Sequence, residues 1–111
     1  RLTFLDTESG IRYCAQSEEV YEKVLHSYLD SDKTEEIEQY YKDKDWKNYQ
    51  VLVHALKSKS LSIGAEELAE DARALEAAAR EGRTDYIMEH HEEVMNSYRN
   101  LLNLLRRELQ S

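Results

Sequence analysis

The chain contains no proline, and only three of its 111 residues are glycine. Proline stops helices, and glycine and proline together build most tight turns, so their scarcity favours long uninterrupted helices. Collagen-like repeats, proline-rich linkers and turn-dense β-sandwiches all require residues that this chain lacks. The sequence therefore predicts an all-α protein.

Apolar residues recur at helical spacing in five segments, which predict helices over about 17–29, 34–41, 45–63, 65–81 and 84–109. The predicted N-caps are Ser17, Thr34, either Asp43 or Asp45, and Thr84. Because connections of a few residues make neighbouring helices antiparallel, we expect an antiparallel up-down bundle with a four-helix core. A short extra N-terminal helix within residues 1–16 is expected to cap it, around Leu2, Leu5 and Ile11.

The helix over 45–63 has the clearest apolar stripe, with steps of three and four residues. We expect the core to combine this stripe with those of the two following helices. The predicted core residues are Trp46, Tyr49, Leu52, Val53, Leu56, Ser60, Ile63, Leu68, Ala72, Leu75, Ala79, Ile87, Val94, Tyr98, Leu101, Leu105 and Leu109. No internal repeat or domain boundary is visible, so residues 1–111 are predicted to form a single domain.

Acidic residues outnumber basic ones by 23 to 15, a formal net charge of −8, and such a surface repels nucleic acid. No apolar run reaches the roughly 18 residues that span a bilayer, so we expect a cytoplasmic domain without direct membrane contact. The single Cys14 excludes an internal disulfide and a cysteine-built zinc site, and it is expected to be buried. The chain starts at Arg1 rather than Met, which indicates a piece of a longer protein.

His54 lies roughly 140° from the centre of the apolar stripe of its helix and is expected to face solvent. Its neighbours on that face include a glutamine, two lysines, a small side chain and two apolar residues. These are Gln50, Lys47, Lys57, Ser58, Val51 and Leu61. Apolar residues around an exposed polar group predict a docking surface, and the small Ser58 lets a partner's backbone approach. By this reasoning the face carries Lys47 and Lys57 and no carboxylate.

An exposed imidazole can act as a nucleophile near neutral pH. Lys57, one turn along the helix, can neutralise a phosphoryl group that the ring of His54 acquires. No phosphate-binding glycine loop and no metal-binding carboxylates accompany the histidine. Magnesium and the second phosphoryl site are therefore expected from a partner, because phosphoryl transfer depends mainly on positioning and charge stabilisation.

The segment from His54 to Ala65, HALKSKSLSIGA, strongly resembles the signature of histidine-containing phosphotransfer (HPt) domains. In that family the phosphoacceptor histidine is followed by lysine at +3, a small residue at +4 and glycine at +10. Lys57, Ser58 and Gly64 occupy these positions, although glycine is common where Ser58 stands. The resemblance continues in segments 6–11, 65–68 and 75–78 and covers nearly the whole chain.

The resemblance implies a phosphorelay intermediate without kinase activity and without a bound cofactor. The chain would take a phosphoryl group from a receiver-domain aspartate and pass it to another receiver, with Mg²⁺ on the receiver. His54 would be the phosphoacceptor and Lys57 its charge stabiliser. Lys47, Gln50, Val51, Ser58 and Leu61 would form the docking face, and Gly64 would be structural, allowing close helix approach. A monomer is expected, free or joined to a hybrid sensor histidine kinase.

Two other functions remain open from the residues alone. One is a helical interaction module that keeps the fold but is never phosphorylated. The other is a metal-binding bundle at His90 and His91, which adjacent helical positions disfavour because they point about 100° apart. His91 falls on the stripe of Ile87 and Val94 and is better interpreted as a hydrogen-bonded core histidine.

Overall fold

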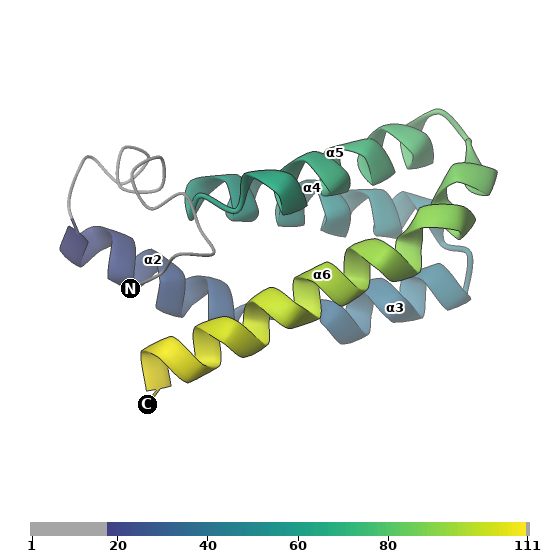
Figure 1. The fold of residues 1–111 in the computed structure, drawn as a ribbon. Helices are drawn as coiled ribbons and strands as arrows, with labels where there is room; N and C mark the ends of the chain where they lie inside the picture. Colours follow the sequence, from purple (N-terminus) through teal and green to yellow (C-terminus); the bar gives the residue numbers. More distant parts are fainter. Residues whose placement is uncertain (1–17, 111) are drawn as a thin grey trace.

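The computed structural model describes residues 18–110, with side chains through Leu109. This part of the chain forms five α-helices and no strand (Figure 1). They are α2 (Glu18–Asp30), α3 (Thr34–Lys42), α4 (Trp46–Ser62), α5 (Glu66–Arg80) and α6 (Thr84–Gln110). The all-α prediction is confirmed. The predicted N-terminal helix, the predicted Ser17 cap and Cys14, which was predicted to be buried, lie outside the described residues.

The five helices make a bundle of four antiparallel rods. In Figure 1, α2 and α3 follow one another along one side, and α4, α5 and α6 then alternate in direction. The long α6 contacts α2, α3 and α5, and α4 likewise contacts α2, α3 and α5. The side made of α2 and α3 is therefore one rod interrupted at residues 31–33. This arrangement confirms the predicted up-down bundle with a four-helix core.

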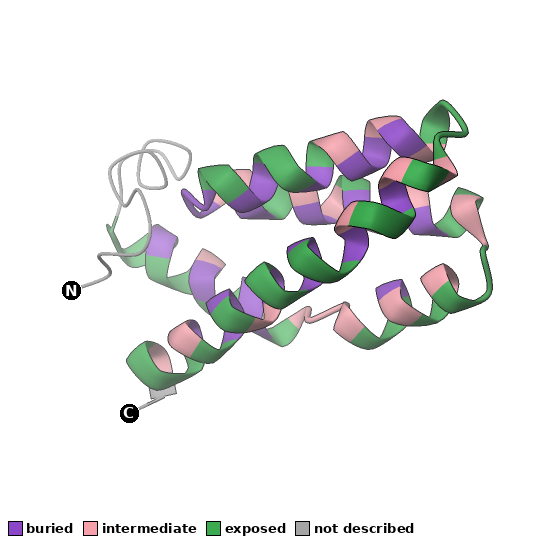
Figure 2. Cartoon of the chain, turned by 45° about the vertical axis from the view of Figure 1, so that its right-hand side comes forward, coloured by how far each residue is buried: buried purple, intermediate pink, exposed green. Residues whose placement is uncertain are grey.

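The core lies where the predicted stripes meet, as the purple bands of Figure 2 show. Of the α4 stripe, Tyr49, Val53, Leu56, Ser60 and Ile63 are buried. The other predicted core residues are buried too, except for four that are partly buried and pack against the core. These four are Trp46, Leu52, Ala79 and Leu109. The periodicity therefore assigned the inward faces correctly.

A serine occurs in the apolar stripe because two buried tyrosines of α2 bring polar groups into the core. The hydroxyl of Tyr28 lies 2.8 Å from Oγ of Ser60, so each satisfies the other. The hydroxyl of Tyr21 donates to the carbonyl oxygen of Ile63 at 2.8 Å. Burial raises the pKa of Tyr28 above its ordinary value, so it remains a neutral phenol. These two hydrogen bonds fix α2 on the C-terminal half of α4.

Three helices end with the same hydrogen-bond pattern around a residue of positive φ. Gly64, with φ of 87°, follows α4, and Gly82, with φ of 71°, follows α5. After α4, the amide of Ala65 donates to the carbonyl of Ser60 at 2.9 Å. Gly64 thus ends its helix as predicted, and the positive φ supplies the physical reason for glycine there. After α3, however, Lys44 occupies the corresponding position with φ of 56°.

Lys44→Gly should raise the free energy of unfolding by about 0.5–1 kcal/mol. Glycine removes the penalty of the left-handed conformation, and its extra freedom in the unfolded chain offsets part of that gain. Urea denaturation measures the change. Lys23→Gly, at an exposed position inside α2, is the control, and its free energy of unfolding should be lower than that of wild type by about 1 kcal/mol. A stability of Lys44→Gly equal to or below wild type would show that the turn is unstrained.

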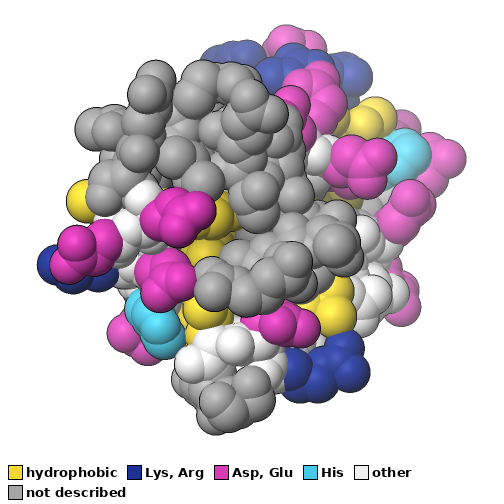
Figure 3. Space-filling view, turned by 60° about the vertical axis from the view of Figure 1, so that its left-hand side comes forward, with side chains coloured by type: hydrophobic (Ala, Val, Ile, Leu, Met, Phe, Trp, Pro, Cys, Tyr) yellow, Lys and Arg dark blue, Asp and Glu magenta, His cyan; other side chains and the backbone are white. Residues whose placement is uncertain are grey.

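Acidic side chains are scattered over the face of the molecule that Figure 3 shows. The acidic residues of segments 66–71 and 89–93 are exposed on α5 and α6, as expected for solvated helix faces. None of the described helices combines the length and apolar character needed to cross a membrane.

Candidate functional site

His54 lies in the middle of α4 on the face opposite the core, and 56% of its side chain is exposed. The predicted orientation is therefore confirmed. Around it, Lys47 and Ser58 are exposed, and Val51 is 60% exposed. Gln50, Lys57 and Leu61 are half-buried. The expectation that Leu61 is exposed, like Val51, is wrong, because Leu61 is half-buried.

The predicted absence of a carboxylate beside His54 is also wrong. Glu76 of α5 places Oε2 2.5 Å from Nδ1 of His54 and Oε1 2.9 Å from Nζ of Lys57. The residue is 7% exposed, so its carboxylate sits between the two helices rather than in solvent. A helical wheel drawn for α4 alone could not show it, since the group comes from a different helix, 22 residues further along the chain.

The sequence does hold a signal for Glu76. Its position continues the inward stripe of α5, four residues after Ala72 and three before Ala79. A glutamate on an apolar stripe requires buried partners, because an unpaired buried charge is costly. Gln50 of the expected docking face makes no side-chain hydrogen bond among the described residues, and Glu76 is the partner of His54.

The two hydrogen bonds keep Glu76 ionised. Burial alone would raise the pKa of its carboxyl group, but the hydrogen bonds from Lys57 and His54 outweigh burial and hold the pKa below its usual value. An ionised carboxylate only accepts hydrogen bonds, so Nδ1 of His54 carries the proton and donates it to Oε2. In the neutral ring, Nε2 then has a free lone pair. The site therefore presents one defined nitrogen on an exposed face.

The other described histidines are placed differently. His26 is exposed on α2, as expected. His91 is only 3% exposed and hydrogen-bonds to Tyr49 and Glu38, which confirms the prediction of a hydrogen-bonded core histidine. Within residues 18–109, no group of three or more histidine, cysteine or acidic side chains is arranged to hold a metal ion.

A family model for the Hpt domain matches residues 14–110, which include all five helices. The chain belongs to the Hpt domain family. No curated protein and no solved structure matches it significantly. Hpt domains are the histidine phosphotransfer domains of two-component systems: they carry phosphoryl groups without intrinsic kinase activity and interact with response-regulator receiver domains. In general terms, the function of this Hpt domain is histidine phosphotransfer in a phosphorelay.

Proposed function

We propose that this Hpt domain is a phosphorelay intermediate that accepts a phosphoryl group on Nε2 of His54 from a receiver aspartate and passes it to another receiver. The observation that carries the proposal is the 2.5 Å contact between Nδ1 of His54 and the ionised Glu76. It directs the ring's lone pair to Nε2, on a side chain that a partner can reach.

The transfer needs no proton from solvent. The lone pair of Nε2 forms a bond to phosphorus while the bond between phosphorus and the aspartyl oxygen breaks, and the aspartate leaves as a carboxylate. The ring, which keeps its proton on Nδ1, becomes cationic, and Glu76 stabilises that charge across the existing hydrogen bond. In the second transfer a carboxylate oxygen of the next receiver's aspartate forms a bond to phosphorus while the N–P bond breaks, and the electron pair of that bond returns to Nε2. We place Mg²⁺ on the receiver in both steps.

Lys57 is proposed to stabilise the phosphoryl charge. Its ammonium group is one helical turn from His54 and bonds to the second oxygen of Glu76 at 2.9 Å. With 28% of its side chain exposed, it lies at the edge of the site and not beneath it. An incoming dianionic group on Nε2 would compete with Glu76 for this ammonium. Lys57 would thus serve the resting site and the phosphorylated one.

The docking face is proposed to comprise Lys47, Gln50, Val51, Ser58 and Leu61. Val51 is the most informative of them, because an apolar side chain that is 60% exposed contributes little to the core. Ser58 leaves space beside the ring, and Lys47 adds positive charge toward the acidic site of a receiver. Lys47 is the one charged residue of this proposed face, whereas the chain as a whole has a formal net charge of −8.

Val51→Glu should slow phosphoryl transfer about tenfold or more and leave the unfolding midpoint unchanged. The new charge lies in the proposed contact and opposes an acidic partner. Transfer from a phosphorylated receiver, followed at several receiver concentrations, measures the effect. Met88→Glu is the matched control, because Met88 is 54% exposed on α6, outside the proposed docking face. Equal slowing in both variants would argue against the docking face.

Phosphopeptide mapping tests the proposed function. The domain is incubated with a phosphorylated receiver, digested at neutral or alkaline pH and analysed by mass spectrometry. We expect an acid-labile phosphate on His54. If no phosphate appears after exposure to several phosphorylated receivers, the non-phosphorylated interaction module is favoured. Phosphate on His26 or His90 would show that His54 is not the phosphoacceptor.

A further inference from the structure

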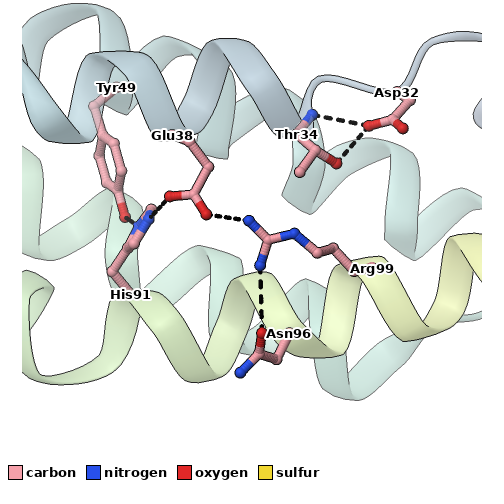
Figure 4. Close-up of polar contacts among 7 residues, drawn as sticks. All are labelled: Asp32, Thr34, Glu38, Tyr49, His91, Asn96 and Arg99. Carbon is pink, nitrogen blue, oxygen red and sulfur yellow. Dashed lines mark hydrogen bonds and ion pairs between the residues drawn. The ribbon is translucent and has the colours of Figure 1, made fainter.

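A second histidine site, unrelated to the phosphoacceptor, joins three helices at the other side of the core. His91 of α6 contacts Tyr49 of α4 through Nδ1 at 2.8 Å and Glu38 of α3 through Nε2 at 2.6 Å (Figure 4). Glu38 also forms an ion pair with Arg99, which lies further along α6 than His91. The ring of His91 is stacked on Tyr41 of α3, with centroids 3.7 Å apart and planes at 2°. We call Glu38, Tyr41, Tyr49, His91 and Arg99 the His91 cluster.

The hydrogen bonds assign the proton to Nε2 of His91. Glu38 is shared with Arg99, and although burial acts to raise the pKa of its carboxyl group, the bonds from His91 and Arg99 lower it overall. An ionised carboxylate must accept, so Nε2–H of His91 donates to it. The hydroxyl of Tyr49, whose pKa burial raises, remains protonated and donates to Nδ1. Among the described residues no buried side-chain nitrogen or oxygen lacks a hydrogen-bond partner, and this holds for the cluster when His91 is neutral.

A proton added to Nδ1 would disrupt this arrangement. The hydroxyl of Tyr49 would have to turn and accept, and its own proton would then face the core without an acceptor among the described residues. Burial lowers the pKa of His91, and Arg99 acts in the same direction; Glu38 and the more distant Glu92 oppose them. The phenols of Tyr41 and Tyr49 are the other titratable groups around the ring. In the folded protein the balance of these groups favours the neutral ring of His91.

Two side chains of α3 cover the ring of His91. Tyr41 covers one face of the ring, and Glu38 occupies its Nε2 edge; both belong to α3. That helix has nine residues, of which Ile37 is buried and Tyr40 and Tyr41 are partly buried against the core. The helix α5, by comparison, buries six residues. Hydrating a cationic His91 would therefore displace α3 before any longer helix.

We propose that the His91 cluster is a proton-operated latch, in which the neutral ring holds α3 against α4 and α6 and protonation at Nδ1 releases α3. Release follows the linkage sign for a histidine whose pKa is lowered by folding. The neutral ring stabilises the fold fully above about pH 6.5, the ordinary value, and this contribution decreases as the pH falls toward the lowered pKa.

Hydrogen exchange of the whole domain tests the latch at pH 7.5 and pH 5.0. After correction for intrinsic exchange, we expect amides of α3 to exchange at least fivefold faster at pH 5.0 and amides of α5 to change less than twofold. His91→Gln, which cannot titrate, should remove the pH dependence of α3. If that variant does not fold, the NMR titration of the His91 ring in the wild type supplies the second measurement.

Tyr49→Phe gives an independent result, since it removes the hydroxyl that donates to Nδ1. It should move the pH at which α3 opens upward, because the neutral ring loses its partner. Equal exchange of α3 at both pH values in the wild type would overturn the latch. So would a pH dependence that persists unchanged in His91→Gln, or a His91 ring that titrates without any change in α3.

Discussion

Replacing His54 with glutamine is expected to abolish acid-labile phosphorylation, a loss of at least 1,000-fold set by the detection limit of the assay. Glutamine keeps a polar group at the site but has no nucleophilic nitrogen. The effect on folding should be small, since 56% of the His54 side chain is exposed and the buried Glu76 keeps Lys57 as a partner. Labelling by a phosphorylated receiver and circular dichroism measure the two properties.

His26→Gln is the matched control for this experiment. His26 is exposed on α2, and the structure gives it no contact with the site. The control should be phosphorylated at the wild-type rate. Equal labelling of wild type and His54→Gln would refute the proposed phosphoacceptor, and loss of labelling in both variants would indicate a general effect of removing imidazoles.

Glu76→Gln is expected to slow transfer through His54 by about 10- to 100-fold, the range found where a carboxylate holds the second nitrogen of a metal-binding histidine. The wild-type carboxylate accepts from two donors at once, His54 at 2.5 Å and Lys57 at 2.9 Å. A glutamine amide has only one acceptor oxygen, so it cannot serve both. If it keeps Lys57, its NH₂ group faces Nδ1 and favours the tautomer with the proton on Nε2, the nitrogen that must attack.

The ring tautomer gives a readout that a merely structural role would not change. Nitrogen NMR of His54 should show the proton on Nδ1 in wild type and a mixture or the opposite tautomer in Glu76→Gln. Glu67→Gln, an exposed change on the same helix, should alter neither the tautomer nor the rate. Slower transfer with an unchanged tautomer would mean that Glu76 acts only through Lys57.

The pH dependence of the free energy of unfolding should also depend on Glu76. Its pKa is lowered in the fold, so its contribution is present above the ordinary value near 4.5 and is lost as the pH falls through the lowered value. Wild type should therefore lose stability in acid more steeply than Glu76→Gln. Urea denaturation at pH 3 and pH 6 gives the comparison.

The fold could be predicted because its determinants are local. The spacing from Tyr49 to Ile63 defines one face of α4, and His54 falls on the opposite face by the same geometry. Gly64 and Gly82 end helices through a conformation that few other residues adopt. These inferences need only the sequence of one helix and its ends.

The chemistry of the site could be predicted only in part, because it depends on pairs of helices. Glu76 and His54 are 22 residues apart, and Glu38 and His91 are 53 apart. No helical period connects such residues; their contact depends on how the rods pack. Leu61 shows a similar limit, since its position on α4 places it on the exposed face and it is nevertheless half-buried. A glutamate or histidine on an apolar stripe predicts that a buried hydrogen-bond partner exists, but it does not identify that partner.

The interrupted rod of α2 and α3 has a consequence for changes in chain length. Its two halves are aligned by α6, which contacts both, and by the hydrogen bond from the Lys33 amide to the Tyr98 hydroxyl at 3.2 Å. A residue inserted in the 31–33 break can bulge outward, whereas one inserted in α6 turns everything after it by about 100°. The length of α6, 27 residues, is therefore fixed by its packing against the other helices. The break at residues 31–33 is where the chain can vary in length.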